Sequence, residues 1–329
     1  MLLAAHDAIL SDLDGVVYAG PYAIEGAPQA LNRAQQMGLP VIFVTNNASR
    51  SVQTVADHLI SLGVETQADY VVSSAQAAAQ LLADQLEPGA KVLVTGSQAL
   101  ADCLSDQGLT PVSSQADEPR AVAQGFNPAM SWENLAEAAY TLADPRVLWV
   151  ASNRDLTIPK ERGLAPGNGT LVAAVATATG RQPQVAGKPE SPIFHTAAQR
   201  VGAKAPLVVG DRLDTDIQGG NRAQMATALV MTGVETYQNV LAAISLERPT
   251  YLLETLDDFF QPYPQIQLET QGEQITARGA GWQASTDGKT LTTSGQGPEI
   301  DRWRVACAAW WATHPQSQQP TSPQEIRHA

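Results

Sequence analysis

Two aspartates, Asp12 and Asp14, follow a short apolar run near the start of the 329-residue sequence. Residues 8–10 have the composition of a buried strand, and Gly15 permits a turn directly after the acids. Open α/β sheets bind ligands at the carboxyl ends of their strands, where both carboxylates would lie. One carboxylate can attack an electrophile while the other transfers a proton. The pair therefore indicates covalent and acid–base catalysis at a strand end.

Phosphorus is an electrophile that suits such a pair. Attack by Asp12 would give an aspartyl phosphate, and Asp14 would first protonate the leaving oxygen and then activate water. Two carboxylates that face a phosphate need a cation between them. Oxygen ligands from Asp12, Asp211 and the backbone carbonyl of Asp14 suit Mg²⁺. Asp211 follows a second apolar strand at residues 207–209, and Asp216 comes shortly after it, so the sequence predicts a magnesium site.

Groups that could bind a phosphate occur at two further places. Thr45 and Asn46 follow the apolar strand at residues 41–44, and a hydroxyl and a backbone amide there can donate hydrogen bonds to phosphoryl oxygens. Lys188, in the turn AGKP, supplies a fixed positive charge. Taken singly, each stretch is also typical of a helix cap or a surface turn. Together, in strand ends and loops, the stretches favour one functional site.

Alternating strands and helices must position these groups. Apolar runs predict strands at residues 8–10, 41–44, 70–72, 91–95, 110–112, 121–124, 147–151, 207–209, 228–231 and 251–253. Periodicity and breakers predict helices at residues 30–37, 51–62, 98–106, 132–143, 170–179 and 192–201. This alternation is typical of a parallel sheet with crossover helices. The predicted fold class is α/β, with a Rossmann-like core.

The order of the predicted strands and helices divides the chain into a core, an insertion and an extension. We predict a core made of residues 1–85 and 183–262, with an inserted α/β cap over residues 86–182. From residue 263 to residue 329 the pattern changes to alternating apolar and polar residues, which predicts antiparallel strands, and a tryptophan-rich helix follows at residues 301–313. The extension is therefore α+β. Its Gln-, Ser- and Pro-rich end predicts a poorly ordered tail.

Composition limits the kinds of partner. Thirty-three acidic against 20 basic residues give a net charge of −13, which argues against a nucleic-acid surface. Cys103 and Cys307 form neither a zinc pattern nor a disulfide framework, as is typical of a reducing cytosol. We find no signal peptide and no apolar run of membrane-spanning length. These features predict a cytoplasmic protein with a small-molecule substrate and no nucleic-acid or membrane partner.

Three stretches of the sequence suggest other interpretations. A calcium loop that begins at Asp12 would need a glutamate where Ala23 stands. The stretch GNG at residues 167–169 lacks the third glycine of a dinucleotide loop, so helix capping explains it better. The tail helix carries aromatic side chains that fit either core packing or a ligand surface, namely Trp303, Trp310 and Trp311.

The motifs DLDGV, FVTNN, GKP and GDRLDTDI, in this order, resemble those of the haloacid dehalogenase (HAD) superfamily of phosphatases. The long insertion between TNN and GKP is similar to the subclass with a large α/β cap, which includes 4-nitrophenyl and phosphoglycolate phosphatases. Asn153, Asp155 and the stretches PKERGLAPGNG and ATATGRQPQVAGKPE resemble the cap of that subclass. The resemblance covers about residues 7–260.

The resemblance implies a role for each matching residue. It makes Asp12 the nucleophile, Asp14 the acid and base, and Lys188 the group that balances charge. The implied metal ligands are Asp12, Asp14 and Asp211, the implied phosphate-binding residues are Thr45, Asn46 and Lys188, and the implied supporting residues are Asn47, Arg50 and Asp216. The resemblance also leaves open a homodimer formed through the cap.

The resulting hypothesis is a Mg²⁺-dependent phosphomonoester hydrolase that acts through an aspartyl phosphate. The extension is similar to that of actinobacterial members that act on glycerol 3-phosphate, which is therefore the first substrate to try. Phosphoglycolate, pyridoxal phosphate and nucleotides are alternatives with the same chemistry, and Asn127 stands where many relatives carry an acid. A phosphometabolite-binding sensor without turnover is the alternative from another class.

Overall fold

The computed structural model describes residues 1–160 and 162–329. The chain forms two compact units, one of Met1–Val41 with Ala203–Ala329 and the other of Ile42–Gly202. Glu161, which belongs to the cap stretch PKERGLAPGNG, lies outside the described residues. None of the helices in the described ranges has the length and apolar character that a membrane span requires.

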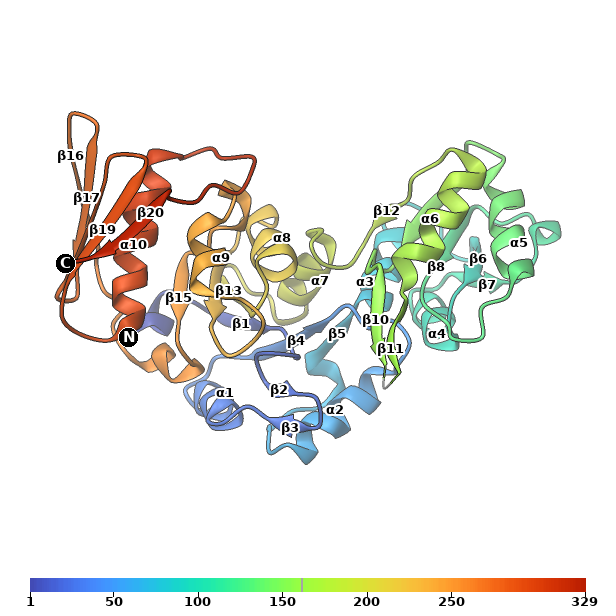
Figure 1. Ribbon diagram of the computed structural model, residues 1–329. Coiled ribbons are helices and arrows are strands. Elements are labelled where there is room, and N and C mark those ends of the chain that lie inside the picture. The colour runs from blue at the N-terminus through green and yellow to red at the C-terminus, as the bar shows by residue number, and fades with distance from the viewer. Residues whose placement is uncertain (161) are drawn as a thin grey trace. The chain divides into compact units, whose positions relative to one another are not determined.

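The first unit contains parallel strands in the order β15-β14-β13-β1 (Figure 1). They are β1 (Ala8–Ser11), β13 (Pro206–Gly210), β14 (Ala226–Val230) and β15 (Tyr251–Leu253). Ile9, Val208 and Leu229 are fully buried, as expected for strands of a covered parallel sheet. Ser11 at the end of β1 pairs with Val209 of β13, so the residues after both strands emerge at the same edge.

Helices and short elements complete this part of the first unit. The helices are α1 (Ala27–Gln36), α8 (Gln218–Arg222) and α9 (Tyr237–Ala242). A small hairpin joins β2 (Tyr18–Ala19) to β3 (Tyr22–Ala23). The 3-10 helices are η1 (Leu2–Ala5), η5 (Ser245–Glu247) and η6 (Leu256–Phe260), and η4 (Leu213–Ile217) is a short π-helix. The π-helix η4 directly follows the edge at which Asp211 emerges.

The second unit begins at Ile42 within β4 (Val41–Thr45), which pairs in parallel with β5 (Val71–Ser73). Its five-stranded sheet has the order β12-β9-β8-β6-β7. These strands are β6 (Lys91–Thr95), β7 (Thr110–Val112), β8 (Ala121–Gln124), β9 (Leu148–Ala151) and β12 (Gln184–Val185). All of their pairings are parallel. The strands β6, β7, β8 and β9 correspond to those predicted from the sequence, whereas the sequence patterns do not predict β12, which lies beyond residue 182.

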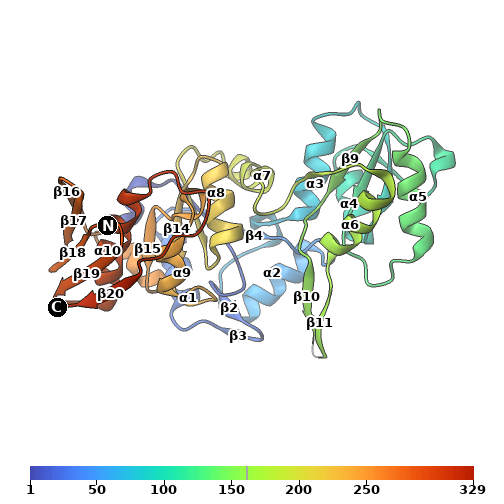
Figure 2. The same ribbon diagram turned by 45° about the horizontal axis from the view of Figure 1, so that its top comes forward.

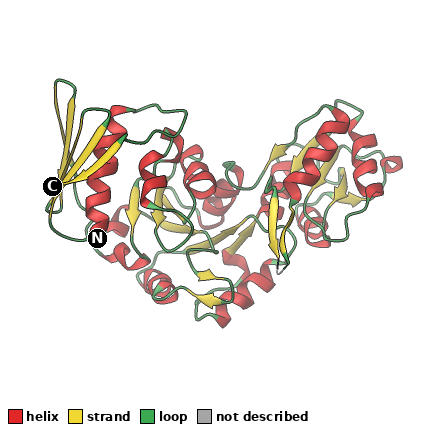
Figure 3. Ribbon diagram, viewed as in Figure 1, coloured by secondary structure: helices red, strands yellow, loops and turns green. Residues whose placement is uncertain are grey.

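Helices pack on that sheet, shown in red beside its yellow strands in Figure 3. They are α3 (Ser74–Ala83), α4 (Gln98–Asp106) and α5 (Trp132–Leu142), with α6 (Asn168–Thr179) packed on α5 and the short turn η3 (Gln115–Asp117) beside α5. The helices α2 (Val52–Ser61) and α7 (Pro192–Val201) contact β5 instead, and the short turn η2 (Ala68–Tyr70) contacts α2. Val122, Trp149 and Val172 belong to the buried core of the five-stranded sheet. The antiparallel hairpin of β10 (Thr157–Lys160) and β11 (Gly163–Pro166) extends away from α6 (Figure 2).

The C-terminal extension is a sheet in the order β16-β17-β18-β19-β20 with α10 (Glu299–Thr313) packed against it. Its strands are β16 (Gln267–Gln271), β17 (Gln274–Gly279), β18 (Trp282–Thr286), β19 (Thr290–Gly295) and β20 (Glu325–His328). Trp303 and Trp310 are buried in one apolar cluster with Leu229 and Leu252 of the parallel sheet. The extension therefore shares a core with the rest of its unit, and the tryptophans serve core packing.

The last residues differ from the expected disorder. Strand β20 pairs in parallel with β19, and the segment before it is held by the Trp310 indole, whose Nε1 donates to the Thr321 carbonyl at 2.8 Å. The Thr321 amide in turn donates to the Ala242 carbonyl at 3.0 Å. The polar composition of the tail does not reveal these contacts, because the partners, Trp310 and β19, belong to other elements. The division into core, cap and extension stays a prediction.

Candidate functional site

Three carboxylates of the first unit lie together. One carboxylate oxygen from each of Asp12, Asp211 and Asp216 lies within 4.8 Å of the others, and we call this group the acid cluster. Asp12 follows β1 and is half-buried, whereas Asp211 and Asp216 are 3% and 1% exposed. Asp14 is exposed to solvent. The parallel pairing of β1 with β13 brings the predicted acids to one place.

Gly15 lets the turn after Asp14 approach the acid cluster. Its φ of +79° is in the left-handed region, and a Cβ atom there would lie 2.1 Å from Oδ2 of Asp211. A side chain at this position would collide with the carboxylate, so the glycine is required both for its conformation and for its small size. Gly15, which the sequence analysis associates with a turn, thus also makes room for the Asp211 carboxylate.

Residues 232–235, which we call the clamp segment, hold both acid-bearing loops. The Thr232 hydroxyl donates to the Gly15 carbonyl at 2.7 Å, and the Val234 amide donates to Oδ2 of Asp211 at 3.1 Å. Sequence reasoning missed this segment. Its signal is the Thr-Gly pair that follows the buried strand β14 after Met231, because the residues that follow parallel strands lie at the same edge of the sheet.

Asp216 is fixed by its own loop. Its Oδ2 accepts hydrogen bonds from the Arg212 amide and the Thr215 hydroxyl, both at 3.3 Å. The hydrogen-bonded carboxylate of Asp214 raises the pKa of the Arg212 guanidinium, and the charges of the acid cluster add to this effect. Arg212 therefore stays protonated beside the acid cluster. Its ion pair is made with Asp214, and both side chains of that pair are partly exposed.

The acid cluster fits a hard divalent cation. Carboxylates held this close repel one another unless a cation or a proton lies between them. Mg²⁺ is bound in proteins through one or two carboxylates together with waters and phosphate oxygens, and Ca²⁺ takes more oxygen ligands in looser geometry. The cluster offers only carboxylate ligands, so its chemistry matches these ions rather than softer metals.

The second unit contains the remaining predicted site residues, and Asn46 organises them. Its Oδ1 accepts from the Lys188 amide at 2.8 Å, while its Nδ2 donates to the Lys188 carbonyl at 3.0 Å and to Asp155 at 3.2 Å. The Asn46 carbonyl accepts from Ser74 and from Asn153. Lys188 is 5% exposed. The Asn46 side chain thus fixes the backbone that carries the lysine.

Other predicted residues of this loop have more local roles. The Thr45 hydroxyl accepts a hydrogen bond from the Asn47 amide at 3.1 Å, and the Asn47 side chain accepts from the Ser49 amide at 2.9 Å. Arg50 is exposed. These bonds shape the loop after β4, in keeping with the supporting role predicted for Asn47.

The cap stretches pack behind this loop. Asn168 is buried, and its Nδ2 donates to the Asn153 carbonyl at 2.8 Å. Gly167 is the N-cap of α6, and a Cβ atom there would lie 2.2 Å from the Asp155 carbonyl oxygen. The GNG stretch is therefore a helix start that packs tightly on residues 153–155. Asn127 donates to the Gly96 carbonyl at 2.9 Å, within the same unit.

Replacing Asn46 by alanine is expected to raise KM for a phosphate substrate about tenfold, because a buried lysine then loses the bonds that fix its backbone. Steady-state phosphate release measures this. Asn127→Ala, which also removes an asparagine hydrogen bond to a loop carbonyl of the same unit, is the matched control and should change KM less than twofold. Equal effects of the two substitutions would contradict the role of Asn46.

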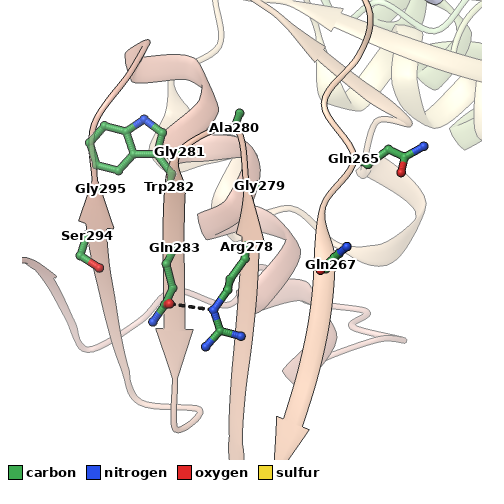
Figure 4. Close-up of a pocket in the computed structure, with 10 residues that line it drawn as sticks. All are labelled: Gln265, Gln267, Arg278, Gly279, Ala280, Gly281, Trp282, Gln283, Ser294 and Gly295. Carbon is green, nitrogen blue, oxygen red and sulfur yellow. Dashed lines mark hydrogen bonds between the residues drawn. The ribbon is translucent and has the colours of Figure 1, made fainter.

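A separate hollow of about 570 Å³ lies on the extension (Figure 4). Its central cation, Arg278, donates to Gln283 at 2.8 Å and forms an ion pair with Glu269 at 2.7 Å. Both contacts are made within the sheet, and they supply the guanidinium with a hydrogen-bond acceptor and a negative charge. The hollow therefore offers less free charge for an anion than its lining suggests.

Comparison with known families bears on the whole chain. Residues 9–110 match the haloacid dehalogenase-like hydrolases, and residues 185–259 match a second, HAD-hydrolase-like family. The D-glycerol 3-phosphate phosphatase of Mycobacterium tuberculosis is 44% identical over 296 residues, which cover 90% of this chain and 80% of that protein. The chain belongs to the haloacid dehalogenase-like hydrolases.

Three further comparisons give the similarity of this chain to individual phosphatases. The 5'-nucleotidase YutF of Bacillus subtilis is 34% identical over 79% of this chain and its own full length. A crystal structure of the M. tuberculosis glycerol phosphate phosphatase with magnesium has a TM-score of 0.85 at 40% identity, covering 100% of this chain and 95% of that one. The p-nitrophenyl phosphatase of Archaeoglobus fulgidus has a TM-score of 0.70 at 31% identity, covering 77% and 97%.

These comparisons confirm the predicted HAD family, the α/β fold class and the identification of the chain as a phosphatase. The structure brings Asp12, Asp211 and Asp216 together in one unit, and it joins Asn46 to Lys188 in the other. The catalytic and binding roles of the individual residues stay predictions.

Proposed function

We propose that this protein is a Mg²⁺-dependent phosphomonoester hydrolase that acts through an aspartyl phosphate on a small metabolite, with glycerol 3-phosphate as the best candidate. The acid cluster is the observation that carries the proposal, because it joins a half-buried carboxylate at a strand end to two buried ones that suit a divalent cation. A phosphoryl group is the anion that such a cation would bring to a carboxylate.

In this proposal Asp12 is the nucleophile. A carboxylate oxygen of Asp12 attacks phosphorus, the bond from phosphorus to the leaving oxygen breaks, and Asp14 gives that oxygen a proton. Asp14 then takes a proton from water, which attacks the aspartyl phosphate and releases inorganic phosphate. The exposed position of Asp14 suits both proton transfers, while the half-buried Asp12 meets less competition from water.

The remaining residues handle charge and orientation. Bound Mg²⁺ would neutralise negative charge on the phosphoryl oxygens, with Asp12, Asp211 and the backbone carbonyl of Asp14 as ligands and Asp216 as support for its water shell. We assign Lys188 the role of a second positive charge and Thr45 and the Asn46 amide the role of hydrogen-bond donors to the phosphate.

Glycerol 3-phosphate is favoured because the M. tuberculosis enzyme matches more of this chain, 90% in sequence and 100% in structure, than the nucleotidase does, which matches 79%. We expect kcat/KM for glycerol 3-phosphate to exceed that for phosphoglycolate, pyridoxal phosphate and nucleoside monophosphates at least tenfold in a phosphate-release panel. The nucleotidase relative makes a nucleotide the second candidate. Glycerol 3-phosphate ranking below any of the others would reject it as the substrate.

The same panel tests the metal and the alternative of a pure sensor. Chelation with EDTA should remove turnover, and added Mg²⁺ should restore it, because the acid cluster alone repels a phosphate. A sensor would bind a phosphometabolite with saturation and release no phosphate. Action in the cytoplasm is part of the proposal, in keeping with the free thiols of Cys103 and Cys307. A homodimer through the cap stays a prediction that light scattering would test.

A further inference from the structure

The clamp segment is itself held by α9. Glu235 accepts a hydrogen bond from the Leu213 amide at 3.2 Å through one carboxylate oxygen, and from the Asn239 side chain at 3.1 Å through the other. Thr236 caps the helix by accepting from the Asn239 amide at 3.2 Å. Through Glu235 and Asn239, the first turn of α9 is thus tied to the loop that follows Asp211.

Helix α9 depends on the extension for its stability. It has six residues, and a helix so short is not stable alone in water. Its buried residues, Val240 and Leu241, lie in the apolar cluster of the extension. The Tyr237 ring stacks on Trp303 of α10, with ring centroids 5.3 Å apart and an angle of 7° between the planes. The Trp311 indole donates to the Leu241 carbonyl at 3.1 Å, so α10 holds both ends of α9 (Figure 1).

The same cluster reaches the loop of the acid cluster directly. Leu213 and Ile217, which flank Asp216 in η4, are 5% and 0% exposed and pack in the apolar cluster that contains Trp303. One apolar cluster therefore connects the loop of the metal-binding acids to the extension. Trp303 is fixed in turn by Glu299, which accepts from its indole nitrogen at 3.0 Å, and by the Arg302 guanidinium over its ring.

From this chain of contacts we propose that the C-terminal extension positions the metal site, with Trp303 and Tyr237 as positioning residues. They hold α9, α9 holds the clamp segment, and the clamp segment holds Asp211 and the turn at Gly15. The proposal rests on the proposed function, because it takes the acid cluster to be the Mg²⁺ site. It gives the extension a role in the reaction that acts through the clamp segment.

The test is Mg²⁺ binding to the full-length protein by calorimetry, without substrate. Trp303→Leu and Tyr237→Leu should each weaken Mg²⁺ binding about fivefold to tenfold, whereas Tyr237→Phe, which keeps the stacked ring, should bind Mg²⁺ as the native chain does. In steady-state assays the apparent Mg²⁺ requirement should rise by the same factor, with KM for substrate at saturating Mg²⁺ changed less than twofold. If Trp303→Leu does not fold, the half-buried Tyr237 provides the measurement.

Trp282→Leu is the matched control. Trp282 is 8% exposed against 6% for Trp303 and belongs to the same apolar cluster, but it lies on β18, where its ring is beside His328. This substitution should lower the melting temperature and leave Mg²⁺ affinity unchanged. Unchanged Mg²⁺ affinity in Trp303→Leu and Tyr237→Leu, or an equal loss in Trp282→Leu, would overturn the positioning role. A native chain that binds no Mg²⁺ would instead refute the proposed function.

Discussion

Replacing Asp12 by asparagine is expected to reduce kcat for phosphate release at least about ten-thousandfold, because the amide offers no nucleophilic carboxylate oxygen. The side chain keeps its size at the end of β1, where the backbone amide of residue 12 donates to the Val209 carbonyl at 2.8 Å. Folding should therefore survive. Phosphate release at saturating Mg²⁺ and substrate measures the loss, and circular dichroism establishes that the variant is folded.

Asp7→Asn is the control for this substitution. Asp7 precedes the same strand, and its carboxylate accepts hydrogen bonds from the amides of Lys204 and Ala205 at 2.7 and 2.9 Å. We expect it to lower thermal stability slightly and to leave kcat within about twofold of the native value, because it lies at the opposite end of β1 from the acid cluster. If Asp12→Asn kept more than about 1% of the native turnover, the aspartyl-phosphate mechanism would be wrong.

Gly15→Ala is expected to lower kcat/KM about a thousandfold. The added Cβ would lie 2.1 Å from Oδ2 of Asp211 and 2.4 Å from its Cγ, so either the turn or the carboxylate must move. Movement of the turn displaces Asp14, and movement of the carboxylate opens the acid cluster. A shift of about 1 Å in a catalytic group costs on the order of a hundredfold in rate, and a contact of 2.1 Å forces one of the two acids to shift by about 1 Å or more. Phosphate release across a Mg²⁺ titration measures the effect.

Gly20→Ala separates this collision from backbone strain. Gly20 has a φ of +58°, and a Cβ atom there would meet nothing within 4 Å. Both alanines suffer the strain of a left-handed conformation, about 1 to 2 kcal/mol, but only the one at position 15 meets a carboxylate. Gly20→Ala should therefore lose stability and keep its activity. Similar kcat/KM values in the two variants would show that the close approach at Gly15 does not matter for catalysis.

The sequence by itself determined the local parts of this site. Asp12 and Asp211 each follow a buried apolar run after one intervening residue. Apolar runs indicate strands because burial on both faces of a parallel sheet selects continuous apolar residues. Parallel strands end at one edge of a sheet, which favours a common site for Asp12 and Asp211, and the observed pairing of β1 with β13 brings the two acids together. The family, the α/β class and the helix start at GNG all follow from patterns of this short-range kind.

Only the tertiary structure decided the contacts between distant residues. The hydrogen bonds of Asn46 to Lys188 join positions 142 residues apart, and those of Thr232 to Gly15 join positions 217 apart. Periodicity shows which face of an element is buried but does not identify what covers it. For the same reason the composition of the tail predicted disorder, whereas the Trp310 indole and β19 hold it in place.

The extension illustrates the difference best. Its tryptophans fitted either a ligand surface or a core when considered as sequence, because an aromatic side chain can be buried by its own protein or by a ligand. Packing decided for the core: Trp303 lies on Tyr237 and shares an apolar cluster with Leu213 of the acid-bearing loop. The acids of the site can thus be predicted from the local sequence. The residues that hold these acids in place cannot, because they depend on which surfaces come together when the chain folds.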